Sequence, residues 1–118
     1  MLGLMVAGCS SPALHQVALA EFEGTGTGRD EWPFDCSGAG RVEVDSTSPE
    51  GWLHVELTDP TGQEAFSQVF DGGPDAGRKD GLFDFDGEGG PGWILAVERF
   101  GYGGDDRFEG SYVVRVLC

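Results

Sequence analysis

The strongest constraint on this chain is a period-two alternation of apolar residues in short runs that glycine and proline interrupt. In the run 52–58, Leu53, Val55 and Leu57 share one side of an extended chain, and Trp52 and Glu56 share the other. Such alternation predicts a half-buried β-strand. The 21 glycines and 6 prolines leave no room for long helices. Short strands joined by turns are therefore expected along the whole chain.

The same pattern predicts seven strands. They cover residues 16–23, 41–45, 52–58, 63–70, 82–85, 93–100 and 111–118. The segment 63–70 is ambiguous, because Thr61 and Glu64 also form a capping-box pattern, but its strand-like neighbours favour a strand. Apolar residues on both faces of 93–100 predict a central strand. Residues 31–36 are predicted to be irregular, because Pro33 cannot donate to a central ladder.

These features predict an all-β fold: a single antiparallel β-sandwich or jelly roll of about seven to eight short strands. A length of 118 residues fits one domain. Eight Phe, three Trp and two Tyr supply core material despite a net charge of −14. We expect residues 1–8 to be a truncated leader, 9–15 a tether and 16–118 the sandwich domain.

Two runs near the C-terminus resemble the closing hairpin of small secreted sandwich domains. They are Pro91–Val97, in which Gly92 precedes Trp93, and Gly110–Val116, in which Gly110 lies two residues before Tyr112. Bacterial pre-peptidase C-terminal and CUB-like modules have such a hairpin. The resemblance implies that these two strands pair with each other.

The residues before Cys9 resemble the lipobox of bacterial lipoproteins. The side chains of Val6-Ala7-Gly8 decrease in size towards the cysteine. The residues Ser10-Ser11-Pro12 after it cannot continue a helix or strand. The resemblance implies export, acylation of Cys9 and a membrane contact made only through the lipid. No Lys or Arg precedes the short apolar stretch. Either the translation start lies upstream of Met1 or the match is accidental and Cys9 is a free thiol.

Three cysteines are an odd number for an exported protein. Lipidation of Cys9 would leave Cys36 and Cys118 to form a disulfide that ties the last strand to the start of the sandwich. Closing a loop of this length stabilises a fold by about 4 kcal/mol in the chain-entropy model. Without export, the two residues are expected to remain unpaired thiols.

The charge balance excludes one class of partner. The 21 Asp and Glu outnumber the 7 Lys and Arg, so the surface repels phosphate backbones and anionic lipid headgroups. No nucleic acid is expected as a partner. An unidentified protein or glycan is expected instead.

An acidic segment is a candidate cation site. Asp84, Asp86 and Glu88 offer carboxylates at alternating positions before two glycines, and Ca²⁺ prefers such oxygen ligands on a flexible backbone. An EF-hand loop would need Glu at its twelfth position, where Leu95 stands. Calcium is the possible cofactor; the alternative is a solvated acidic turn.

Trp52 is the best candidate for a ligand contact, because its strand directs it away from Leu53 and Val55. Neither His15 nor His54 has a partner that the sequence can identify, and no nucleophile motif is present. We therefore expect a non-catalytic cell-envelope lipoprotein or secreted module for binding or structure. The alternatives are a calcium-stabilised accessory domain that binds carbohydrate or peptide and, least favoured, a small hydrolase.

Overall fold

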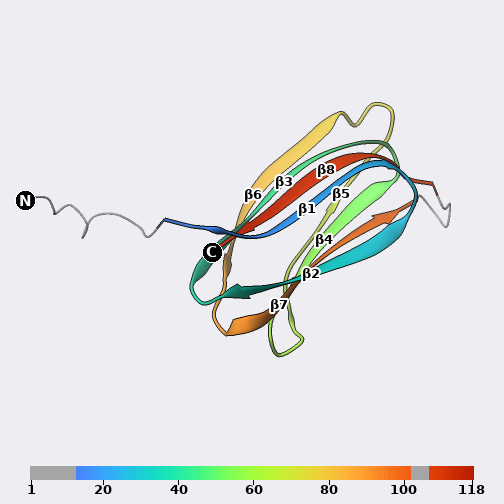
Figure 1. Cartoon of the computed structure of the whole chain (residues 1–118). Coiled ribbons are helices and arrows are strands. Elements are labelled where there is room, and N and C mark those ends of the chain that lie inside the picture. The colour runs from blue at the N-terminus through green and yellow to red at the C-terminus, as the bar shows by residue number, and fades with distance from the viewer. Residues whose placement is uncertain (1–12, 102–106) are drawn as a thin grey trace, which may run out of the picture.

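A computed structural model describes residues 13–101 and 107–118. Cys9, the leader and most of the expected tether lie outside these residues. Eight strands form two antiparallel four-stranded sheets that face each other (Figure 1). The first sheet has the order β1 (Gln16–Thr25), β8 (Glu109–Leu117), β3 (Ala39–Glu50), β6 (Arg78–Asp86). The second has the order β2 (Gly28–Cys36), β7 (Gly90–Phe100), β4 (Trp52–Thr58), β5 (Glu64–Phe70). The expected all-β sandwich is confirmed.

The chain is folded as one long ribbon that doubles back at the β4–β5 hairpin. From that hairpin outward, β3 pairs with β6, β2 with β7 and β1 with β8, and successive pairs alternate between the sheets. This strand order is that of an eight-stranded jelly roll. Strands that are neighbours in sequence therefore lie mostly in opposite sheets.

The core follows the predicted alternation. The inward residues of four strands are almost fully buried: Val42 and Val44; Leu53, Val55 and Leu57; Trp93, Leu95 and Val97; Tyr112, Val114 and Val116. Both sheets contribute to one apolar layer. Burial at about 25 cal/mol per Å² of apolar surface is the main force that holds the sheets together. β7 lies between β2 and β4, so its predicted central position is confirmed.

The expected pairing of the last two strands is wrong. β7 pairs with β2 and β4, whereas β8 pairs with β1 and β3 in the other sheet. The physical reason is the doubled ribbon, which carries the chain from one sheet to the other between β7 and β8. The resemblance to a closing hairpin does not hold for the pairing of these strands.

The structure also contains strand where irregular chain was expected. Residues 28–36 form β2, an edge strand, which tolerates Pro33 because one side of its ladder has no partner strand. β3 extends to Glu50 through Ser46 and Ser48, whose buried small side chains face inward in place of apolar ones. The ambiguous segment 63–70 contains the strand β5 rather than a helix.

The two ends of the sandwich differ. We call the end that holds the turns 37–38, 59–63 and 87–89 the disulfide end, and the opposite end, with the turn at Gly51 and the loop 71–77, the far end. The chain enters β1 at the disulfide end, where the backbones of His15 and Cys118 exchange two hydrogen bonds of 2.8 Å. Within the described part of the chain, no helix is long and apolar enough to cross a membrane.

Candidate functional site

The outer face of the second sheet, which we call the β4 face, gathers the chemically versatile side chains. In each strand, every second side chain points away from the core. The outward residues on this face include Arg29, Glu31, Trp52, His54, Glu56, Ser67, Val69, Ile94, Glu98 and Phe100. The face therefore combines aromatic rings, a histidine, a hydroxyl and an arginine with three carboxylates.

An aromatic pair lies on the β4 face at the far end. Trp52 opens β4 opposite Phe100, which closes β7. Their ring centroids are 5.6 Å apart with an interplanar angle of 73°, an edge-to-face contact. Trp52 is half-buried, and the structure places it on the outward side, as expected. Trp93, by contrast, is 1% exposed in the core.

Arg29 organises the acidic part of the β4 face. Its guanidinium lies 3.0 Å from Glu56, 3.2 Å from Glu31 and 3.8 Å from Glu98. The hydrogen bond from Arg29 holds the pKa of Glu56 below its ordinary value. One cation thus compensates three carboxylates, which leaves a net negative field on this face.

His54 and Ser67 form a second polar contact on the β4 face. The His54 Nε2 atom lies 2.7 Å from the Ser67 hydroxyl oxygen across β4 and β5. A nucleophilic serine needs its histidine base to be oriented by a third group. Among the described carboxylates, none forms an ion pair with His54 within 4.0 Å. The contact joins polar side chains of β4 and β5 on this face.

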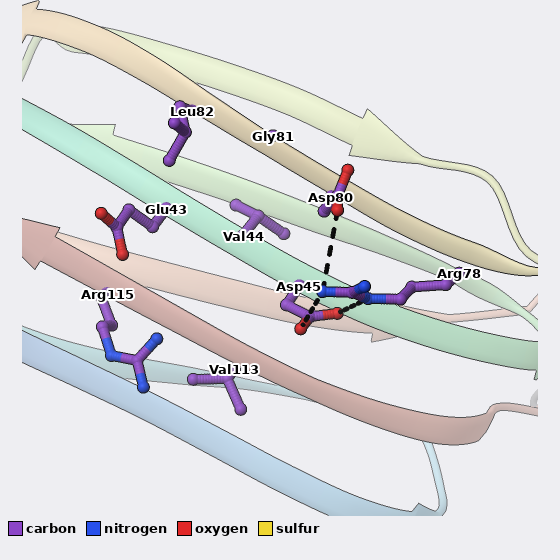
Figure 2. Close-up of a pocket in the computed structure, with 9 residues that line it drawn as sticks. All are labelled: Glu43, Val44, Asp45, Arg78, Asp80, Gly81, Leu82, Val113 and Arg115. Atoms are coloured by element: carbon purple, nitrogen blue, oxygen red, sulfur yellow. Dashed lines mark hydrogen bonds and ion pairs between the residues drawn. The ribbon is translucent and has the colours of Figure 1, made fainter.

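The outer face of the first sheet carries a shallow hollow of about 390 Å³ (Figure 2). Arg78 crosses it and contacts both oxygens of Asp45 at 2.8 Å, with Asp80 at 3.7 Å. The hydrogen bonds from Arg78 hold the pKa of Asp45 below its ordinary value. Leu82 at the rim is 65% exposed. Arg78 forms ion pairs with Asp45 and Asp80 in the hollow, and Glu43 and Arg115 add further charge to its lining.

Two of the three proposed calcium ligands, Asp84 and Asp86, are engaged in other contacts. Asp84 lies 3.3 Å from Arg41 on the outer face of β6. Asp86 accepts a hydrogen bond from the backbone N–H of Glu88, and the Glu88 carbonyl accepts one from the Trp93 indole. No group of three acidic, histidine or cysteine side chains in ranges 13–101 and 107–118 is arranged to hold a metal. Calcium binding stays a prediction.

The predicted disulfide between Cys36 and Cys118 is present, with Cα atoms 5.6 Å apart. It links the edge strand β2 of one sheet to the end of β8 in the other. Gly87 packs so closely against the bridge that a Cβ atom added at this position would overlap the Cys36 sulfur. A hollow of about 900 Å³, lined by Leu14, Val17 and Phe85 among others, adjoins the bridge.

Sequence reasoning missed Arg99, whose side chain is only 10% exposed. It lies between the sheets at the far end, 2.9 Å from Asp30 and 4.0 Å above the Phe22 ring, and donates to the Gly26 carbonyl at 2.9 Å. A signal was present: Arg99 continues the inward register of Trp93, Leu95 and Val97.

No protein-family model matches the chain, and no curated protein is similar to it in sequence. Solved structures give low-identity likenesses. The arabinose-bound MgGH51 α-L-arabinofuranosidase has a TM-score of 0.49 and 12% identity over 90% of this chain and 23% of its own. A structure of infectious bursal disease virus, Gx strain, has a TM-score of 0.47 and 11% identity over 92% and 32%. The chain thus spans a third or less of these chains, and neither likeness bears on function.

Proposed function

We propose that this chain is a non-catalytic, exported sandwich module that is anchored by a lipid on Cys9 and holds its far end away from the membrane. One observation carries the proposal: the chain enters the sandwich from the side of Cys9 at the disulfide end, whereas the aromatic pair of Trp52 and Phe100 lies at the far end. The bridge between Cys36 and Cys118 favours an oxidising compartment.

The position of the N-terminal residues indicates which end of the sandwich would lie nearer the membrane. Residues 13–15 lead into β1 beside Cys118, at the disulfide end. β1 has 10 residues, and at about 3.3 Å per residue it spans about 33 Å to the far end. Trp52 and Phe100 lie there. A module tethered at Cys9 would therefore present this aromatic pair to partners outside the lipid surface.

Metabolic labelling with a fatty-acid analogue tests the anchor. The natural chain, expressed from its own gene with the upstream region, should take up label, and the Cys9→Ser variant should not. A Cys36→Ser, Cys118→Ser double variant controls for label on other thiols and should keep it. Absence of label from the natural chain would remove the lipoprotein proposal.

A second candidate function is carbohydrate or peptide binding at Trp52. The half-buried indole beside Phe100 supports it, because sugar rings and peptide side chains stack on such surfaces. Glycan and peptide arrays probed with the natural chain, Trp52→Ala and Trp52→Phe test it. Binding should be lost in Trp52→Ala and partly kept in Trp52→Phe. Leu82→Ala, on the opposite face, is the matched control and should bind normally.

A further inference from the structure

We propose that the outer face of the first sheet binds an extended peptide of a partner protein, laid across the strands, with an apolar side chain at each end and a carboxamide between them. The contact is one cross-strand row of outward side chains, in which each residue lies directly opposite the next: Leu82 on β6, Glu43 on β3, Arg115 on β8 and Leu19 on β1. We call these four residues the leucine row. Three of them, Leu82, Glu43 and Arg115, line the hollow of Figure 2.

The two central side chains of the leucine row do not close an ion pair. Glu43 and Arg115 are opposite charges at directly opposed positions, and such charges attract each other across a sheet. Their charged atoms nevertheless lie more than 4.0 Å apart, and no line joins them in Figure 2. On the same face, Arg41 lies directly opposite Asp84 and contacts it at 3.3 Å. The sheet therefore permits such a contact, and Glu43 and Arg115 keep an acceptor and a donor for another molecule.

Arg115 is unusual among the basic residues of this acidic chain. Every other arginine lies within 4.0 Å of at least one carboxylate: Arg29, Arg41, Arg78, Arg99 and Arg107. Arg115 forms no such pair with any described residue. The hydrogen bond from Arg78 is the main cause of the lowered pKa of Asp45, and the charge of Arg115 adds to it at longer range. The Arg115 guanidinium, with its planar set of donors, is thus placed to receive an oxygen atom of a ligand.

Exposed leucines lie at both ends of the leucine row. Among the described residues, the exposed large apolar side chains are Leu19, Val69 and Leu82, and two of these three belong to the row. Leu82 is 65% exposed and Leu19 is 37% exposed. Apolar side chains of a partner would remove both from water. The row contains no aromatic face on which a sugar ring could stack, so a peptide fits it better than a glycan does.

The spacing of the row matches an extended peptide. Neighbouring strands are about 4.8 Å apart, so three spacings place Leu19 about 14 Å from Leu82. Residues i and i+4 of an extended chain are also about 14 Å apart, at about 3.4 Å per residue, and they face the same side as residue i+2. Apolar side chains at i and i+4 therefore cover the two leucines. The side chain at i+2 then lies over Glu43 and Arg115.

A carboxamide suits this centre better than a charged group. The net charge of −14 repels an acidic peptide, and a basic side chain that pairs with Glu43 would meet the charge of Arg115. The side chain of Asn or Gln can donate to Glu43 and accept from Arg115 with one neutral group. Neither the lipid anchor on Cys9 nor a ligand at Trp52 is needed for this contact.

NMR titration of the isotope-labelled chain tests the contact surface. The probe is a blocked synthetic peptide with leucine, glutamine and leucine at positions i, i+2 and i+4 and threonine elsewhere. It should shift the amide signals of β1, β3, β6 and β8, whereas a peptide of the same composition in scrambled order should not. Absence of these shifts at millimolar peptide would overturn the proposal. So would shifts of the same strands by an oligosaccharide and not by the peptide.

Two substitutions on opposite faces locate the site. Leu82→Ser should raise the dissociation constant of the probe peptide about tenfold, because an apolar contact is lost. Trp52→Ala, on the β4 face, is the control and should leave this dissociation constant unchanged. A probe peptide that binds at Trp52 would give the reverse result and would contradict the leucine row as its site.

Exchange of the two central charges tests the role of the carboxamide. Glu43→Arg alone and Arg115→Glu alone leave two like charges in the centre, so each should weaken binding about tenfold or more. The double variant restores one acceptor and one donor, and a carboxamide turned by half a rotation meets both, so most of the affinity should return. A folded double variant that binds no better than the single variants would contradict the carboxamide contact. Should a charge variant fail to fold, the scrambled peptide and Leu82→Ser still decide the proposal.

Discussion

Cys36 and Cys118 connect the two sheets at one end of the sandwich, although 82 positions separate them in sequence. The bridge links β2 covalently to the end of β8. We predict that replacing both cysteines by alanine lowers the free energy of unfolding by about 4 kcal/mol, because the unfolded chain regains the entropy of a long loop. Urea unfolding of the oxidised chain and the double variant measures this difference. Cys9→Ser, as the control, should unfold like the natural chain; equal stability of the double variant would show that the bridge is dispensable.

At the far end, the two sheets are stabilised by the buried guanidinium of Arg99 and its partners. Arg99 is 10% exposed, and its partner Asp30 is 52% exposed. We predict that Asp30→Ala lowers the free energy of unfolding by about 1–3 kcal/mol, because it leaves the guanidinium with only neutral partners. Asp35→Ala, an exposed carboxylate on the same strand, should change it by less than about 0.5 kcal/mol. If the two variants unfold alike, the ion pair does not stabilise the far end.

For the strands that the sequence predicted, alternation showed which residues face the core, but it did not show which strands pair with each other. Alternation is a local property, and it correctly directed Leu53, Val55 and Leu57 into the core. Pairing is set by the doubled ribbon, a long-range property that no short run encodes. The hairpin expected between Trp93 and Tyr112 was therefore wrong, although both residues are buried as their alternation predicted.

The candidate site was predicted only in part. Trp52 was placed on the outward side because its neighbours are apolar, but its contact with Phe100 depends on the register between β4 and β7. The His54–Ser67 contact joins residues from two strands and likewise needs their register. β2 was missed because Pro33 argues against a central strand, and the sequence does not show that this strand lies at an edge.

Calcium should have little effect on stability. Asp84 is paired with Arg41, and Asp86 accepts the Glu88 backbone N–H. Because these carboxylates do not converge on one point in the structure, we predict that millimolar CaCl₂ shifts Tm no more than MgCl₂ at equal ionic strength. Thermal melts with each salt and with a chelator measure this. A Tm rise specific to calcium, abolished in Asp84→Asn, would instead establish the cation site.

The Arg29–Glu56 contact predicts a pH-dependent stability. The hydrogen bond from Arg29 lowers the pKa of folded Glu56 from its ordinary value of 4.5, so the folded state favours the ionised carboxylate. Its stabilisation is present above pH 4.5 and is lost as the pH falls through the lowered folded-state pKa. We predict that Glu56→Gln costs about 0.5–1 kcal/mol at pH 7, as is usual for a partly exposed pair. The difference between the natural chain and this variant should vanish in acid, as urea unfolding across pH would show. Glu88 forms no such ion pair among the described contacts, so the control Glu88→Gln should have nearly the same free energy of unfolding as the natural chain at any pH. If the stability loss in Glu56→Gln persists in acid, the effect comes from packing and not from charge.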